Sequence, residues 1–186
     1  MAANAVNYQV IGPNDVYLGR TPGEWMSEFM GWLFSINPDQ HNSGPVVFLK
    51  PFPYERTPDY PVRNEPNLMI GKDKLQIFTD QPIMIPVLLS YWATNDPNET
   101  ETMMRERIRS DMINSDELRK DQITIDGNSI EIDEDIKDYL IESPLFTLSV
   151  PEDEYTKSVA NMVDWPVMPG VNQSVATAYI FIVKFP

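Results

Sequence analysis

Few residues in this sequence could carry out catalysis. The chain has no cysteine and one histidine, His41, which lies in a polar segment after an expected helix end. A catalytic histidine needs a nucleophile beside it and a third group that orients it. No nucleophile elbow, phosphate-binding loop, dinucleotide fingerprint or paired-histidine motif is present. We therefore interpret His41 as a surface residue and predict that the protein is not an enzyme.

Carboxylates offer a second kind of chemistry. Asp133, Glu134 and Asp135 are consecutive, and Asp138 and Glu142 follow them. Calcium prefers hard oxygen ligands of this type, but the spacing does not match the EF-hand loop. Acidic residues also favour the cap and first turn of a helix. We prefer this second interpretation and expect no cofactor, with a calcium site as the alternative.

Aromatic and methionine side chains in two proline-rich segments could bind another molecule. The segments are residues 50–66 and 151–170, which we predict to be loops or docking arms. Stiff segments lose less conformational entropy when they dock, and aromatic residues and methionine are enriched at protein interfaces. Trp165 could instead close the end of the fold. The candidate interaction residues are Phe52, Tyr54, Tyr60, Trp165 and Met168.

The clearest structural signal is a helix start at residues 21–24. Thr21 can cap the helix, Pro22 suits the first helical position, and Glu24 can reach back to the cap. Apolar residues then recur at spacings of three and four. This pattern predicts an amphipathic helix over residues 22–35 with one apolar face in the core.

The rest of the chain is mainly β. A second capping pattern at residues 96–99 predicts a helix over 97–113. Short apolar runs separated by proline and Asp-Gly turns favour a β-sandwich or jelly roll, with the two helices inserted. We expect a single domain over residues 1–186. The predicted strands include residues 46–49, 83–89, 145–150 and 176–185, with a hairpin at 123–132.

The charge of the chain excludes some partners. The formal net charge is −14, and no basic patch interrupts it. Phosphate backbones and anionic membranes repel such a surface, so we expect neither direct nucleic acid binding nor membrane binding. Residues 1–10 lack a basic start and an apolar stretch, so we expect no signal peptide and synthesis in the cytoplasm.

Several segments resemble an uncharacterised group of bacterial and phage proteins. Residues 19–25, Gly-Arg-Thr-Pro-Gly-Glu-Trp, are similar to their opening motif, YGxTxGEWxxxWWxWxxSI. The Asp-Gly hairpin near residue 126 and the segment 143–151, of the type sPxFxLxxP, follow in the same order. Met30 and Gly31 precede Trp32 where the group carries an aromatic pair. The resemblance implies a compact β-rich domain without known activity.

These observations predict a non-enzymatic structural protein. The expected role is a phage virion component, such as a capsid decoration or surface subunit, made in the host cytoplasm. Its expected partners are a capsid or other virion protein and further copies of the same chain. The alternative is a binding module for carbohydrate or another small ligand, dependent on calcium, that uses Trp165 and the acidic segment.

Overall fold

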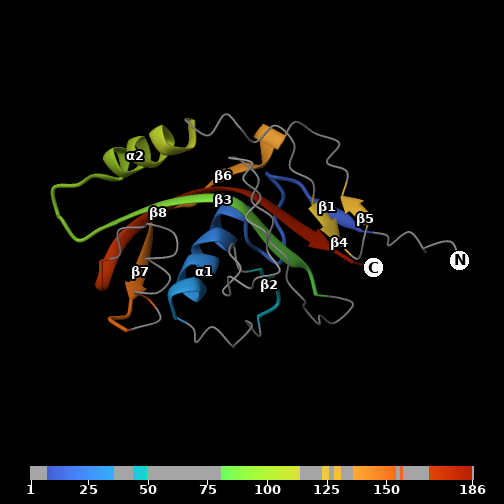
Figure 1. Ribbon diagram of the computed structural model, residues 1–186, viewed down its shortest axis with the longest axis horizontal. Coiled ribbons are helices and arrows are strands. Elements are labelled where there is room, and N and C mark those ends of the chain that lie inside the picture. The colour runs from blue at the N-terminus through green and yellow to red at the C-terminus, as the bar shows by residue number, and fades with distance from the viewer. Residues whose placement is uncertain are drawn as a thin grey trace, which may run out of the picture.

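Strands dominate the structure, and two helices are inserted between them (Figure 1). The computed structural model describes residues 8–35, 44–49, 81–113, 123–125, 128–130, 136–153, 156 and 168–185. The mainly β class with two inserted helices is confirmed. In chain order the elements are β1 (Gln9–Ile11), α1 (Pro22–Ser35), β2 (Val47–Phe48), β3 (Ile83–Thr94), α2 (Glu101–Ile113), β4 (Ile123–Ile125), β5 (Asn128–Ile130), the 3-10 helix η1 (Ile136–Tyr139), β6 (Leu140–Glu142), β7 (Phe146–Val150) and β8 (Gly170–Lys184).

Strand β8 is the centre of the main sheet. Along one edge it runs antiparallel to β3, from Gln173 opposite Thr94 to Val183 opposite Ile83. Its other edge pairs in turn with β7, β6 and β1, all antiparallel. Strand β2 pairs in parallel with β3, so the described part of the sheet has six strands. The predicted hairpin at residues 123–132 is confirmed by the separate pair β4–β5.

The two helices lie against opposite faces of this sheet. Side chains of a strand point alternately to its two faces. Ala178 and Ile180 of β8 belong to the buried cluster that contains the apolar residues of α1. Val175 instead packs with Met104 and Ile108 of α2. In the described part of the chain a helix therefore covers each face of the sheet. In a β-sandwich a second sheet would cover one of these faces instead.

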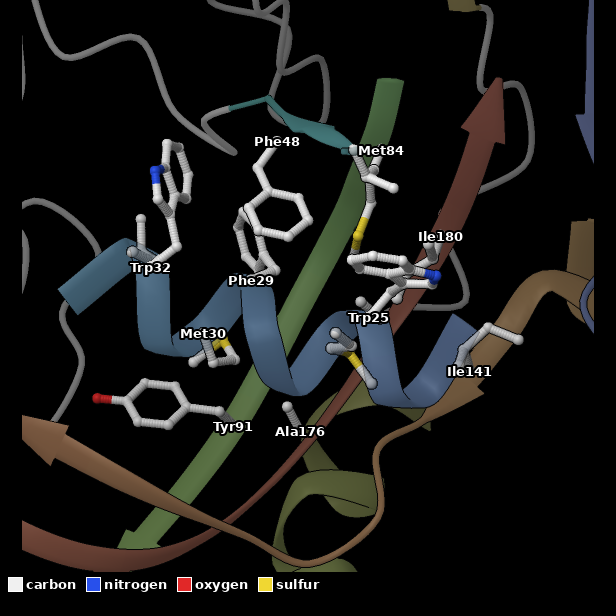
Figure 2. Close-up of a cluster of buried hydrophobic side chains, with 14 of the residues drawn as sticks. Trp25, Phe29, Met30, Trp32, Phe48, Met84, Tyr91, Ile141, Ala176 and Ile180 are labelled. Atoms are coloured by element: carbon white, nitrogen blue, oxygen red, sulfur yellow. The ribbon is translucent and has the colours of Figure 1, made fainter. Parts of the chain in front are cut away.

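The apolar face predicted for α1 is buried. Phe48 of β2 lies at the centre of an aromatic group, with its ring centroid 5.7 Å from that of Phe29 and 5.6 Å from that of Trp32. Figure 2 shows these rings above the strands, with Met84 and Ile180 beside them. Edge-on ring contacts add to the free energy gained by burial alone. Helix α1 is thus the main cover of the sheet.

Strand β3 has a bulge directly after Pro86. The register of β3 against β8 shifts between Val87 and Leu89. One extra residue in a strand changes the face to which the following side chains point. As a result Met84, before the bulge, and Tyr91, after it, both join the cluster under α1.

Helix α2 begins at Glu101, so the predicted start at residue 97 was wrong. The Asp96 carboxylate accepts a hydrogen bond from the Asn98 backbone N–H at 2.9 Å, which closes a tight turn instead of capping a helix. Thr100 is the N-cap, since its hydroxyl accepts from the Met103 N–H at 3.3 Å.

Several strands differ from the sequence predictions, and β3 continues to Thr94 instead of ending at residue 89. Strand β8 begins at Gly170 instead of residue 176, because its polar first half pairs with β7. Strand β6 was not predicted, since its few residues show no alternating pattern and are held by pairing with β8. The strand predicted at 145–150 is confirmed as β7.

Candidate protein-contact surface

A tight turn precedes α1. Tyr17 and Arg20 exchange two backbone hydrogen bonds, of 2.8 and 3.1 Å. Between them Leu18 has a φ of 51° and Gly19 a φ of 79°. Two successive positive φ angles characterise a type I′ turn, which favours asparagine, aspartate and glycine. A leucine with such a φ costs on the order of 1 kcal/mol.

The turn is attached firmly to α1. The Trp25 indole N–H donates to the Tyr17 carbonyl oxygen at 3.0 Å. The Arg20 guanidinium lies 5.0 Å from the centroid of the Trp25 ring and pairs with Glu28 at 2.5 Å. A buried tryptophan therefore holds the turn by both its polar atom and its ring face.

The predicted capping box is confirmed. The Thr21 backbone N–H donates to the Glu24 carboxylate at 2.7 Å, and the Glu24 N–H donates to the Thr21 hydroxyl at 3.3 Å. The backbone N–H and then the hydroxyl of Thr21 lower the pKa of Glu24 below its ordinary value.

Gly23 allows α1 to touch the backbone of β6. A Cβ atom at this position would lie 2.5 Å from the carbonyl oxygen of Glu142. Only glycine permits such a close approach. Residues 17–25 include the segment that resembles the bacterial and phage motif. Trp25 and Arg20 fix the turn to α1, and Gly23 lets α1 pack against the sheet.

This scaffold presents apolar side chains to solvent. Val16 is 65% exposed and Leu18 is 56% exposed. We call Val16, Leu18 and Gly19 the hairpin tip. Asp15 lies beside the tip in sequence, and Glu24 and Glu28 lie on the first turns of α1, so carboxylates outnumber the single guanidinium of Arg20 in residues 15–28. An anchored apolar tip with acidic surroundings is suited to contact with another protein.

Of the residues predicted from the sequence to form an interaction site, the structure describes Met168 alone. Phe52, Tyr54, Tyr60 and Trp165 lie outside the described residues. Met168 is half-buried before β8, and its carbonyl oxygen accepts from the Asn172 side-chain amide at 2.8 Å. Sequence reasoning missed the hairpin tip. The sequence feature at the tip is a glycine, Gly19, directly after Leu18. Hydrophobic periodicity does not show that such a pair forms a turn or that its leucine is exposed.

Where the acidic segment is described, it forms ion pairs with α2. Glu142 accepts ion pairs from Arg105 at 3.3 Å and from Arg109 at 2.9 Å. Asp138 is exposed on η1, while His41 and residues 133–135 lie outside the described residues. Within the described ranges no group of three or more histidine or acidic side chains is arranged to hold a metal ion. None of the described helices is long and apolar enough to cross a membrane.

A second polar cluster joins α2 to the end of β3. The Glu99 carboxylate, largely buried, lies 3.0 Å from Nε of Arg107, and the Arg107 guanidinium lies 4.6 Å from the Trp92 ring centroid. Burial disfavours the charged form of Glu99, but hydrogen bonding from Thr94 and Trp92 and the Arg107 charge outweigh burial and the nearby Asp96 charge. The pKa of Glu99 therefore lies below its ordinary value.

Comparisons with known proteins assign no family to this arrangement. No model of a protein family matches the chain, and searches of curated proteins and of solved structures likewise find no match.

Proposed function

We propose that this protein is a non-enzymatic structural protein of a phage virion, such as a capsid decoration or surface subunit. In this proposal the hairpin tip is one of its contacts with another virion protein. The single observation that carries the proposal is the conformation of Leu18, which is both strained, with a φ of 51°, and more than half exposed.

Neither property of Leu18 helps the isolated chain to fold. A left-handed leucine costs free energy, and an exposed leucine gains none from burial. Asparagine or glycine would form the same turn without strain. A leucine is useful at this position if its side chain is buried by a partner, because an apolar side chain buried at an interface contributes binding free energy.

The anchoring of the tip supports the same role. Trp25 and Arg20 fix the turn before any partner arrives. A preformed contact loses little conformational entropy on association. The net charge of −14 keeps the chain soluble at the high local concentrations of a particle surface. The resemblance of its N-terminal segment to phage proteins supports the virion setting.

The test is the protein composition of particles purified by density gradient from cells that carry the encoding genome. Quantitative mass spectrometry is expected to find the chain in the particle band, at a copy number proportional to that of the major capsid protein. A chain that stays in the soluble fraction while the capsid protein enters the particle band would contradict the proposal.

A further inference from the structure

We infer that Asn172 and Ser174 of β8 form a binding site for one buried water molecule, which bridges their two side chains inside the fold. The inference is independent of the proposed function, because the site lies in the interior of the chain. It follows from two buried oxygen atoms without a partner, from their spacing along β8, and from the bonds that orient the Asn172 side chain.

Both side chains are polar, buried and incompletely hydrogen-bonded. Asn172 is 1% exposed and Ser174 is 0% exposed. Within the described part of the chain, neither the Asn172 side-chain oxygen Oδ1 nor the Ser174 hydroxyl oxygen Oγ has a hydrogen-bond partner. A buried oxygen without a partner loses the hydrogen bonds that it makes to water in the unfolded chain. Such atoms are rare in native proteins, so two of them close together on one strand require an explanation.

The two side chains lie on the same face of β8. Side chains two residues apart on a strand point the same way, and Ala176, the next on this face, belongs to the apolar cluster that contains α1. Ser174 is paired with Phe146 of β7 on one side and with Ala93 of β3 on the other. Both of these neighbours are partly buried against the same cluster. The side chains beside Ser174 are therefore apolar and offer it no hydrogen bond.

The spacing along β8 suits a single bridging molecule. Two residues of an extended strand advance about 6.6 Å, which keeps two short side chains such as Asn172 and Ser174 from bonding to each other directly. A water molecule about 2.8 Å from each of two oxygen atoms spans up to about 5.6 Å between them. It can donate to Oδ1 of Asn172, which only accepts, and exchange a hydrogen bond with the Ser174 hydroxyl. One water therefore supplies a partner to both oxygen atoms, as buried waters do elsewhere.

The remaining bonds of Asn172 orient its oxygen. The side-chain nitrogen Nδ2 donates to the carbonyl oxygens of Met168 at 2.8 Å and of Gly170 at 3.2 Å. Because only the nitrogen of a carboxamide can donate to a carbonyl, these two bonds decide which atom is Nδ2 and which is Oδ1. Nitrogen and oxygen diverge from the same carbon, so Oδ1 is directed away from Met168 and Gly170, which precede Asn172. Ser174 lies in the other direction along the strand.

The experiment counts long-lived water molecules by oxygen-17 relaxation dispersion of water in a solution of the purified full chain. The probe is the oxygen of water itself, so exchange of hydroxyl protons does not contribute. Ser174→Ala is expected to lower the dispersion amplitude by about one water molecule. The matched control is Ser149→Ala, which makes the same change at an exposed position of β7 and should keep the wild-type amplitude. An unchanged amplitude in Ser174→Ala would overturn the inference.

The urea midpoint of the same two variants gives an independent sign. With a bound water, Ser174→Ala removes one of its partners and leaves it less well bonded, so the midpoint is expected to fall. A hydroxyl that is merely unsatisfied gives the opposite result, because alanine then removes a buried polar group that has no partner. Ser149→Ala is expected to unfold close to the wild-type midpoint. A midpoint of Ser174→Ala at or above that of the wild type would therefore refute the water site.

Discussion

Helices α1 and α2 lie on opposite faces of the same strand, yet they are attached by different physics. Helix α1 contributes fully buried Phe29 and Met30 to the largest apolar cluster. Among the described side chains of α2, Met104 and Ile108 are buried against Val175 of β8 and the partly buried Trp92. Polar attachments add to these, and include the contacts of Arg105 with Glu142 and with the Ser143 carbonyl.

The difference indicates which helix depends on pH and salt for its attachment to the sheet. Burial of apolar surface is non-directional and nearly independent of pH and salt. Ion pairs depend on the protonation of both partners, and exposed pairs are screened by salt. We therefore expect α1 to stay packed whenever the sheet is folded, while α2 loosens first in acid or in high salt.

The sharpest test of this comparison replaces one buried methionine on each helix. Met30 and Met104 are both fully buried. Met→Ala costs about 2 to 5 kcal/mol, depending on how well the site collapses around the cavity. We expect Met30→Ala near the top of that range and Met104→Ala near the bottom, because the less firmly packed α2 can shift to fill the space. Urea denaturation measures both values, and equal losses would remove the distinction between the helices.

A second test compares two glycines of α1. Gly23→Ala would place a methyl group against the backbone of β6, whereas a Cβ at Gly31 would meet nothing within 4 Å. We expect Gly23→Ala to destabilise by about 1 to 3 kcal/mol through overpacking. Gly31→Ala should stabilise by about 0.5 to 1 kcal/mol, since alanine favours the helix. Thermal unfolding of the two variants gives the signs, and a tolerated Gly23→Ala would show that α1 does not rest on β6.

Helix α1 was predictable from contacts between residues close in sequence, whereas the hairpin tip that α1 supports was not predicted. The capping box and the spacing of aromatic residues specify a helix by contacts within a few residues, and its bounds were correct. The same reasoning placed the start of α2 too early, because Asp96 forms its hydrogen bond two residues ahead in a turn. A single sequence does not distinguish these two uses of an aspartate.

The candidate site depended on backbone conformation and side-chain exposure. The sequence drew attention to four aromatic residues and Met168 in proline-rich segments, and of these only Met168 lies in the described part. The hairpin tip is defined by backbone angles at Leu18 and Gly19 and by the contact of Trp25 with Tyr17. Neither a φ angle nor a contact between a helix and a preceding turn has a periodic signature. Exposure of an apolar side chain likewise becomes visible only once the fold is known.

The contacts of Glu99 predict how the stability of the attachment of α2 changes with pH. Because the native pKa of Glu99 is lowered, its ionised form stabilises the fold above the ordinary glutamate pKa of about 4.3. This contribution is lost as pH falls through the lower, native pKa. Glu99→Gln is expected to lower the free energy of unfolding by about 1 to 2 kcal/mol at neutral pH. The variant should also lose less stability than the wild type as the pH falls. Urea midpoints between neutral and strongly acidic pH measure this decline, and an unchanged acid slope in the variant would exclude Glu99 as its source.

The smallest expected effects separate two arginines that share one carboxylate. Arg105 is largely buried and also holds the Ser143 carbonyl, whereas Arg109 is more than half exposed and, within the described part of the chain, pairs with Glu142 alone. Arg105→Met leaves a carbonyl unsatisfied and is expected to cost about 1 to 2 kcal/mol. Arg109→Met is expected to cost less than about 1 kcal/mol, and less again in high salt. Repeating both in a Glu142→Gln background gives the coupling energies. A larger cost for Arg109→Met than for Arg105→Met would mean that surface charge, and not the bond to the Ser143 carbonyl, attaches α2 to the sheet.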